Sequence, residues 1–271
     1  MKKSLSFIII CLMAVTATAQ NIHVGSFYVT TPTDEKLFGD GNNNWTTRQT
    51  HICNLFKFER PDILSLQGAT EAQMKTIRSG MNSGMTGVVS YNLAGDIIYN
   101  NTVTLDTCGV VTDMPEGSVA TWAKFQKDEK TFFVFNVNFS SEGSLSTTST
   151  TRLIAAIGEI NPDKLPVFIT GLIGCNENAP RSAYTRLSSR YYDSYTTSSA
   201  VSAEYGTVNN FDIEANHGTD RYDFIFHSKS IITSKAYGQL ESGYFTKEAD
   251  NSYKRRMLST HFPIMVKATI N

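Results

Sequence analysis

The stretch Leu165-Pro166-Val167-Phe168-Ile169-Thr170-Gly171-Leu172-Ile173-Gly174 decides the fold. It carries no charge, and its apolar side chains form a short run that glycine closes. Such a run is typical of a strand that is buried on both faces in the middle of a sheet. Ligands of α/β proteins bind outside the carboxyl ends of these strands. We therefore expect Leu172 and Gly174 to lie at the position of a functional site, although neither side chain carries a reactive group.

The rest of the chain alternates strand patterns with helix patterns. Apolar residues at helical spacing predict helices at residues 45–58, 71–81, 152–160 and 181–189. Short runs between turn residues predict strands at residues 22–30, 63–67, 87–93, 96–99, 103–111, 120–126, 131–139, 207–211 and 221–226, with closing segments at 258–263 and 264–270. The Ser/Thr-rich residues 140–151 are predicted to form a loop. Because no repeat or linker interrupts the pattern, residues 20–271 are predicted to form a single domain.

The N-terminal residues have the pattern of a signal peptide. Lys2 and Lys3 precede a short apolar core at residues 7–15, and Ala17-Thr18-Ala19 fits the small-x-small cleavage rule. We expect residues 1–19 to be removed and the protein to be secreted or periplasmic. No later apolar run is long enough to span a bilayer, so no transmembrane segment is expected after cleavage.

The charge balance argues against nucleic acid as a partner. Removing Lys2 and Lys3 from the 24 basic residues leaves 22, against 25 acidic residues, so the mature chain has a formal charge of 22 − 25 = −3. Binding to a phosphate backbone needs a basic surface instead.

The spacing of histidines and cysteines does not predict a metal site. We interpret four histidines as structural or exposed, namely His23, His51, His217 and His227, and three cysteines as small buried hydrophobic residues, namely Cys53, Cys108 and Cys175. None of them has the spacing of zinc ligands. The odd number of cysteines after residue 19 leaves at least one free thiol, even in an oxidising compartment.

Seven short motifs occur in an order that is similar to a known family. They are Trp45-x-x-Arg48, Pro61-Asp62-Ile63-Leu64-Ser65-Leu66-Gln67, Thr121-Trp122-Ala123-Lys124-Phe125, Phe135-Asn136, Thr170-Gly171, Arg221-x-Asp223-Phe224-Ile225-Phe226 and Ser259-x-His261-Phe262-Pro263. Their order resembles the endonuclease/exonuclease/phosphatase superfamily. The resemblance implies an α/β (α+β), DNase I-like fold: a four-layer α/β/β/α sandwich with two mixed β-sheets packed face to face and helices outside. It also implies phosphoester hydrolysis with a divalent metal, usually magnesium, which prefers oxygen ligands.

Most positions that carry the family's chemistry are substituted in this chain. Tyr28 replaces the family's Asn on the first strand, and Gly68 replaces the metal-binding Glu that follows Leu66-Gln67. In the family's Asn-x-His-x-Asp motif, Asn138 and Ser140 replace the His and the Asp.

The later motifs are also incomplete. Leu172 and Gly174 replace the Asp and the Asn of the Gly-Asp-x-Asn motif, and Thr260 replaces the Asp of the closing Ser-Asp-His motif. What remains is Asp223 and His261, which resemble the family's Asp–His dyad and are the candidate catalytic residues.

Two other retained residues are candidates for contact with a substrate. Asn136 begins the Asn-x-His-x-Asp motif, and Arg221 precedes the dyad's Asp223. The dyad itself has two interpretations: a catalytic pair, in which Asp223 orients His261 as a base, or a buried structural hydrogen bond.

The missing carboxylates predict that no metal cofactor binds. Two unit charges about 4 Å apart interact by about 4 kcal/mol at an effective dielectric constant near 20, and a divalent ion loses roughly twice that for each absent carboxylate. We therefore expect a pseudoenzyme that acts as a binding module. The alternative is a weak magnesium-dependent phosphodiesterase or phosphatase that uses Asp223, His261 and a displaced carboxylate, either Glu71 or Glu177.

The sequence does not name the ligand. A glycan, a peptide and a phosphorylated small molecule all stay open. The stretch Tyr191-Tyr192-Asp193-Ser194-Tyr195 could line a glycan or peptide site, since tyrosine combines an apolar ring with a polar tip. Its other interpretation is an edge strand.

Overall fold

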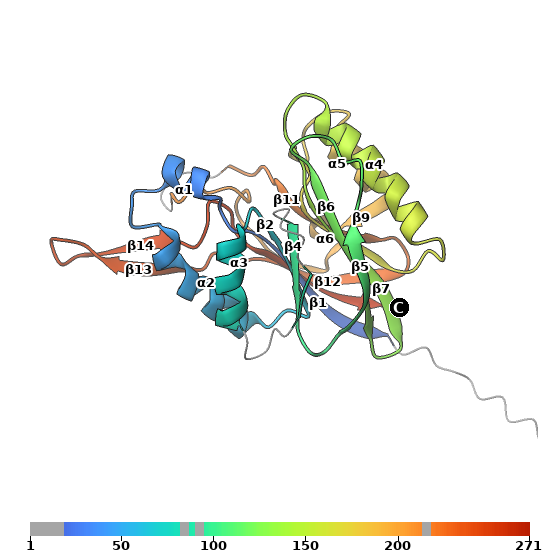
Figure 1. Ribbon diagram of the computed structural model, residues 1–271, viewed down its shortest axis with the longest axis horizontal. Helices are drawn as coiled ribbons and strands as arrows, with labels where there is room; N and C mark the ends of the chain where they lie inside the picture. The colour runs from blue at the N-terminus through green and yellow to red at the C-terminus, as the bar shows by residue number, and fades with distance from the viewer. Residues whose placement is uncertain (1–18, 82–86, 90–94, 213–217) are drawn as a thin grey trace, which may run out of the picture.

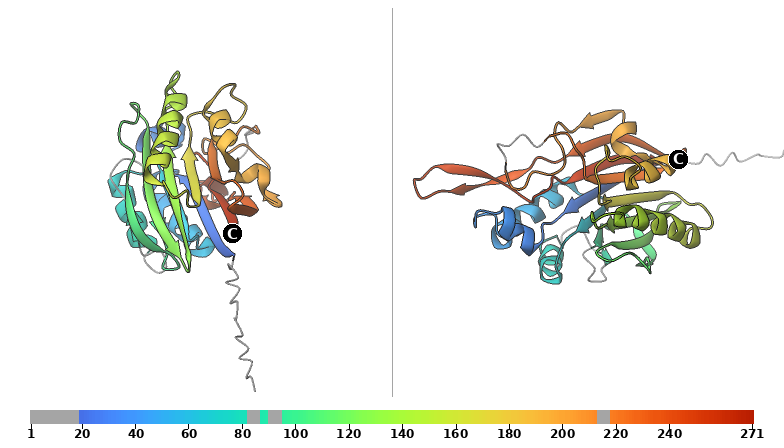
Figure 2. Two further views of the ribbon diagram at one scale, coloured as in Figure 1. Left: turned by 90° about the vertical axis from the view of Figure 1, so that its right-hand side faces the viewer. Right: turned by 90° about the horizontal axis from the view of Figure 1, so that it is seen from above.

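Two mixed β-sheets pack face to face, and helices cover their outer faces (Figures 1 and 2). The computed structural model describes residues 19–81, 87–89, 95–212 and 218–271. The arrangement confirms the predicted four-layer α/β/β/α sandwich. Within the described residues, no helix is both long and apolar enough to cross a membrane.

The first sheet is built around the N-terminal strand. Its strands lie in the order β10 (Ala200–Ser202), β12 (Ile232–Gln239), β15 (Ile264–Ile270), β1 (Gln20–Tyr28), β2 (Ile63–Gln67), β4 (Gly95–Tyr99) and β3 (Gly87–Val89). The pairs β1–β2 and β10–β12 are parallel, and the others are antiparallel. The first and last strands of the chain are therefore neighbours, which brings the segments after Tyr28 and before Ile264 to one end of the sheet.

The second sheet contains the uncharged apolar strand at residues 167–172. Its strands lie in the order β5 (Thr104–Val110), β6 (Val119–Lys127), β7 (Lys130–Asn138), β8 (Val167–Leu172), β11 (Asp223–Ser228) and β9 (Tyr191–Asp193). Strand β8 runs parallel to β7 and antiparallel to β11. It is buried and lies inside the sheet, as predicted. The edge-strand interpretation of residues 191–195 holds for residues 191–193, which form β9 at the edge, whereas Ser194 and Tyr195 are helical.

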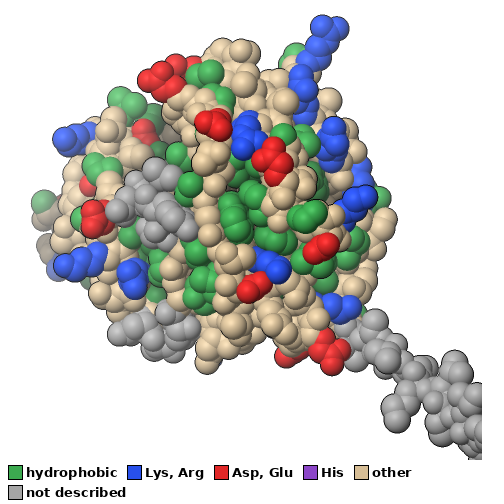
Figure 3. Space-filling model, turned by 45° about the vertical axis from the view of Figure 1, so that its right-hand side comes forward, with side chains coloured by type: hydrophobic (Ala, Val, Ile, Leu, Met, Phe, Trp, Pro, Cys, Tyr) green, Lys and Arg blue, Asp and Glu red, His purple; other side chains and the backbone are tan. Residues whose placement is uncertain are grey.

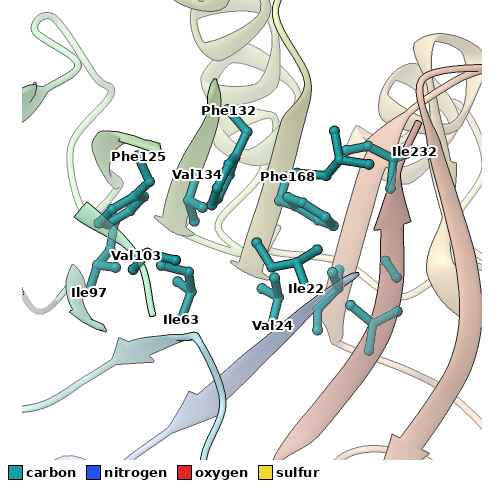
Figure 4. Close-up of a cluster of buried hydrophobic side chains, with 14 of the residues drawn as sticks. Ile22, Val24, Ile63, Ile97, Val103, Phe125, Phe132, Val134, Phe168 and Ile232 are labelled. Carbon is teal, nitrogen blue, oxygen red and sulfur yellow. The ribbon is translucent and has the colours of Figure 1, made fainter. Parts of the chain in front are cut away.

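A core of aliphatic and aromatic side chains fills the space between the sheets (Figure 4). Ile22 and Val24 point up from β1, and Phe132 and Phe168 point down from the opposite sheet. The rings of Phe132 and Phe168 meet edge to face, with centroids 6.3 Å apart. Full burial of one such side chain contributes about 1.5–3 kcal/mol, so this layer is a principal source of stability.

Two pairs of helices cover the outer faces. Helices α2 (Trp45–Glu59) and α3 (Glu71–Met81) pack on the first sheet through Ile52, Phe56, Met74 and Ile77. Helices α4 (Leu145–Ile160) and α5 (Ala183–Arg190) pack on the second sheet through Leu153, Ala156 and Leu187. The short helices α1 (Pro32–Phe38) and α6 (Ser194–Thr197) follow β1 and β9. Strands β13 (Gly243–Lys247) and β14 (Tyr253–Met257) form a separate antiparallel ribbon that projects from the sandwich (Figure 1).

Helix α4 begins earlier than predicted. Residues 145–151 were expected to continue a Ser/Thr-rich loop, but they form the first two turns of the helix. Thr148, Thr150 and Thr151 donate their hydroxyl protons to carbonyl groups four residues earlier, and Ser146, Ser149 and Thr150 are buried. Burial in tertiary structure thus overrides the low helix propensity of these residues.

Residues 207–211 do not form the predicted strand. They contribute an isolated antiparallel bridge between Val208 and His261. The backbone of Asn210 and Phe211 has positive φ values of 50° and 64°, which ends extended structure at that point. Part of another predicted strand, residues 87–93, falls on 90–93, which lie outside the described residues; Gly87–Val89 form β3.

The face drawn in Figure 3 has a mixed charge. Hydrophobic side chains gather near its middle, and both acidic and basic side chains surround them.

Candidate functional site

Asp223 and His261 form a hydrogen-bonded pair at the end of the second sheet. Asp223 is the first residue of β11, and His261 lies in the bridge to Val208. Nδ1 of His261 lies 2.8 Å from Oδ2 of Asp223. The carboxyl group is fully buried, and the imidazole is 12% exposed. With Nδ1–H donating to the carboxylate, Nε2 of a neutral ring is left as a hydrogen-bond acceptor.

Tyr28 fills the space beside this pair. Its ring centroid lies 4.7 Å from that of His261, and its hydroxyl group donates a hydrogen bond to Asp34 of α1. Burial, together with the Asp34 carboxylate, raises the pKa of the Tyr28 phenol far above its usual value. Tyr28 is therefore a neutral, anchored side chain at physiological pH.

The ring of Tyr28 also occupies the space beside Gly68. A β-carbon on residue 68 would lie 2.5 Å from Cε2 of Tyr28. In addition, Gly68 has a φ of +72°, a conformation that other residues adopt only with strain. A glutamate at position 68, as the family resemblance requires for a metal, has no room in this structure.

The end of β8 has no room for the family's Asn at position 174. Leu172 is the last residue of the strand and pairs with Asn138 of β7. Gly174 has a φ of +73°, and a β-carbon there would lie 2.3 Å from the carbonyl oxygen of Ser140. Close approach of the backbone at Ser140 therefore requires glycine at position 174.

Asn136 is a buried link between the two sheets. Its Nδ2 donates to the carbonyl groups of Leu66 and Asp96, at 2.9 and 2.8 Å, and its Oδ1 accepts from Nε2 of Gln67 at 2.7 Å. It is fully buried, so its side chain holds β7 against β2 and β4. These contacts occupy the polar groups that the sequence analysis assigned to a substrate.

Thr260 takes part in a second buried network. Its backbone N–H donates to Oγ1 of Thr30 at 2.8 Å, and the two hydroxyl groups lie 3.0 Å apart. Ser259 also contacts Thr30 and donates to the carbonyl group of Tyr28. The network ties the segment before β15 to the end of β1, on which Tyr28 stands.

Arg221 is directed to an ion pair away from the dyad. Its Nη2 lies 2.8 Å from Oδ2 of Asp193, its guanidinium carbon lies 4.2 Å from the ring centroid of Tyr195, and the residue is 5% exposed. Burial alone would lower the pKa of Arg221, but the carboxylates of Asp193 and Glu177 raise it above its usual value. Its partner Asp193 belongs to the tyrosine-rich stretch at residues 191–195. The two residues are far apart in the sequence, so no sequence pattern predicts their contact.

Of the two carboxylates that could replace the missing ligands, Glu177 is engaged by Arg221 and Glu71 lies on the surface. Glu177 accepts a hydrogen bond from the backbone N–H of Arg221 at 2.8 Å, and its other oxygen lies 3.7 Å from Nε of the same residue. Glu71 is an exposed residue in the first turn of α3. Within the described ranges, no group of three or more His, Cys, Asp and Glu side chains is arranged to hold a metal. Together with the ring of Tyr28 at the Glu position, these residues do not fit a magnesium ion.

A cavity opens beside His261. Its volume is about 370 Å³, and the described residues that line it are Phe139, Ser141, Leu172, Gly174, Val208, Tyr222 and His261. The cavity thus lies at the carboxyl end of β8, where the sequence analysis placed the site. Ser141, Val208 and Tyr222 carry no motif signal, so their part in it could not be found from the sequence.

Sulfur chemistry is not a feature of the site. Within the part of the chain that the structure describes, Cys53, Cys108 and Cys175 form no disulfide bond. Cys53 is buried, which raises the pKa of its thiol, whereas Cys108 and Cys175 are half-buried. The prediction of small buried residues therefore holds fully for Cys53 only.

Known structures share this fold. Neither a family model nor a curated protein matches the chain. An endonuclease/exonuclease/phosphatase family protein from Bacteroides thetaiotaomicron has a TM-score of 0.84 and 20% sequence identity to this chain. The match covers 94% of this chain and 99% of that protein. The mannosyl-6-phosphatase of Bacteroides thetaiotaomicron VPI-5482 has a TM-score of 0.82 and 21% identity, and the match covers 91% of this chain and 99% of that protein. An endonuclease/exonuclease/phosphatase from Bacteroides vulgatus has a TM-score of 0.77 and 18% identity, and the match covers 93% of this chain and 100% of that protein. This likeness establishes the architecture that the motifs implied: the chain has the DNase I-like fold of the endonuclease/exonuclease/phosphatase superfamily.

Proposed function

We propose that this protein has lost metal-dependent phosphoester hydrolysis and acts as a non-catalytic binding module outside the cytoplasm. The observation that carries the proposal is the contact between Tyr28 and Gly68. The side chain that should hold the metal is absent, and an anchored aromatic ring stands in its place. The signal-peptide pattern of residues 1–19 supports the location.

The chemistry of phosphoester hydrolysis explains why this substitution matters. Catalysis requires that charge on the phosphoryl oxygens be stabilised and that water be activated, tasks for which this fold family uses a divalent metal. Removing one catalytic hydrogen-bond donor already costs about 10²–10³ in rate. In this chain Gly68, Leu172 and Thr260 stand at three carboxylate positions. The dyad of Asp223 and His261 would have to act without the electrostatic partner that its role requires.

One observation favours a second candidate function. The dyad keeps a hydrogen bond of 2.8 Å, and His261 lines an accessible cavity. A weak phosphodiesterase or phosphatase, in which His261 acts as a base and a divalent metal binds elsewhere near the cavity, is therefore the alternative.

A hydrolysis assay separates the two functions. p-Nitrophenyl phosphate, bis-p-nitrophenyl phosphate and mannose 6-phosphate are offered with magnesium, with manganese and with a chelator; the sugar phosphate is included because of the name of one fold neighbour. The binding-module proposal predicts turnover no faster than buffer in every condition. Metal-dependent turnover that disappears in His261→Ala but persists in His51→Ala, a control histidine on α2, would instead establish the weak hydrolase.

A further inference from the structure

We infer that the cavity beside the Asp223–His261 pair binds an uncharged, hydroxyl-bearing ring, such as one pyranose unit of a glycan. This inference rests on the proposed function and names its ligand class. The cavity lies beside the pair that resembles the family's catalytic dyad, but its lining has the chemistry of a ligand other than a phosphate.

The lining has no permanently charged cation to balance a phosphate. Among the described residues around the cavity there is no Lys or Arg. The guanidinium group of Arg221, two residues before Asp223, is committed to Asp193. Phosphate recognition relies on cationic donors and bidentate arginine contacts. Moving a phosphate from water into this cavity would therefore remove its hydration without a permanent positive charge to compensate.

The same lining suits a ring with apolar C–H faces. Phe139, Leu172 and Val208 supply apolar walls, and Tyr222, which is 37% exposed, supplies an aromatic ring with a polar tip at the surface. Ligand sites typically combine such walls with a few well-placed polar groups. The volume of about 370 Å³ is at the lower end of the ligand-pocket range, so the cavity accommodates one small ring.

The imidazole of His261 provides the polar anchor. Its Nδ1 is held by the buried Asp223, so Nε2 is presented as a fixed acceptor for a hydroxyl proton of the ligand. The hydroxyl group of Ser141 adds a second polar contact that can donate or accept. The pair that would act as a base in a hydrolase thus becomes a hydrogen-bond acceptor for a neutral ligand.

Saturation-transfer NMR and calorimetric titration of the full mature chain test this inference, with a chelator present throughout. The probes are the methyl pyranosides of glucose, galactose, mannose and N-acetylglucosamine, together with mannose 6-phosphate. We expect at least one neutral pyranoside to bind with a Kd near 1 mM, a usual strength for a weak small ligand, and to bind at least tenfold more tightly than the phosphorylated sugar.

Three variants assign the binding to the cavity. Tyr222→Ala and His261→Phe are each expected to weaken binding at least tenfold, and Tyr253→Ala, which removes a 69% exposed tyrosine of the β13–β14 ribbon, is expected to leave it unchanged. Because Tyr222 is partly exposed, its removal keeps the test valid if His261→Phe fails to fold. Tighter binding of the phosphorylated sugar, no binding of any pyranoside, or binding unaffected by Tyr222→Ala would overturn the inference. Since a chelator is present, these outcomes are independent of metal-dependent turnover, which tests the proposed function separately.

Discussion

The ring of Tyr28 packs directly against the α-carbon of Gly68 and leaves no room for a side chain at position 68. A β-carbon there would lie 2.5 Å from Cε2 of Tyr28. Two of the substitutions that distinguish this chain from the family pattern, Tyr28 and Gly68, are therefore one structural change. The tyrosine can occupy its position only because residue 68 is glycine, and the hydrogen bond to Asp34 holds it there. Replacing Gly68 alone cannot rebuild a metal ligand.

Gly68→Ala is predicted to lower the free energy of unfolding by about 3 kcal/mol. Roughly 1–2 kcal/mol comes from the positive φ, and the remainder comes from displacing the Tyr28 ring in a packed site. Gly41→Ala is the matched control, since Gly41 also has a positive φ of 85° but has nothing within 4 Å of a β-carbon. Urea unfolding of both variants measures the difference. Equal losses would show that Tyr28 moves aside freely.

Restoring the family's side chains should depend on Tyr28. Because the ring blocks the position, we expect Tyr28→Asn to offset part of the loss caused by Gly68→Glu, with a coupling of about 1 kcal/mol or more between these contacting residues. A double-mutant cycle in urea measures this coupling. Strictly additive losses would contradict the contact.

Arg221 is predicted to act in stability. Arg221→Met leaves the buried carboxylate of Asp193 without its cation, which costs about 3–5 kcal/mol. Lys124→Met removes the exposed pair with Asp106 and is expected to cost at most about 1 kcal/mol. Thermal or urea unfolding compares the two. If Arg221→Met lowers the free energy of unfolding by less than about 1 kcal/mol and also weakens ligand binding, Arg221 would have the substrate-binding role that the sequence suggested.

Asn136→Leu is also predicted to destabilise the fold. The variant removes the hydrogen bonds of Asn136 to two buried carbonyl groups and one of the two acceptors of Nε2 of Gln67, which also donates to Ser26. Loss of a buried hydrogen bond costs about 1–3 kcal/mol where it leaves a group unsatisfied. Asn138→Leu, at the half-buried end of the same strand, serves as the comparison. Similar unfolding midpoints for the two variants would show that the inter-sheet link contributes little.

Acid should destabilise the protein through His23. Burial, and then the nearby Lys267, lowers the pKa of His23 to about 4 in the folded chain, whereas the unfolded value is about 6.5. The unfolded state thus binds the proton first, and the free energy of unfolding falls as the pH drops from 6.5 towards 4. When the pH falls from 7 to 4.5, we expect the free energy of unfolding of His23→Gln to decrease by about 2 kcal/mol less than that of the parent chain. Parallel pH profiles for the two proteins would refute the shift.

The sequence predicts the architecture well where burial leaves a local pattern. The uncharged run at Val167–Leu172 indicated an interior strand, and the periodic apolar residues of α2 and α3 located both helices within a residue. Prediction failed where tertiary contacts oppose local propensity. The Ser/Thr-rich start of α4 is helical because it is buried, and residues 207–211 lose their strand because Asn210 and Phe211 adopt positive φ.

The candidate site could be located from the sequence, but its contacts could not. Motif order identified Tyr28, Gly68, Leu172 and His261 as residues of one site. The steric dependence of Tyr28 on Gly68, and the commitment of Arg221 to Asp193, depend on three-dimensional packing between distant segments. Residue spacing along the chain does not predict such contacts. Tyr28 and Arg221 could therefore be identified from the sequence as candidate site residues, but their contacts could not.

Calorimetric titration of residues 20–271 with magnesium and with manganese tests the loss of the metal site most directly. With Tyr28 in the position of the metal ligand and Glu177 engaged by Arg221, we predict no binding heat up to millimolar metal. A single site with a Kd below about 100 μM, or roughly −5.5 kcal/mol, would contradict the loss of the metal site and establish that a displaced set of ligands has taken over its function.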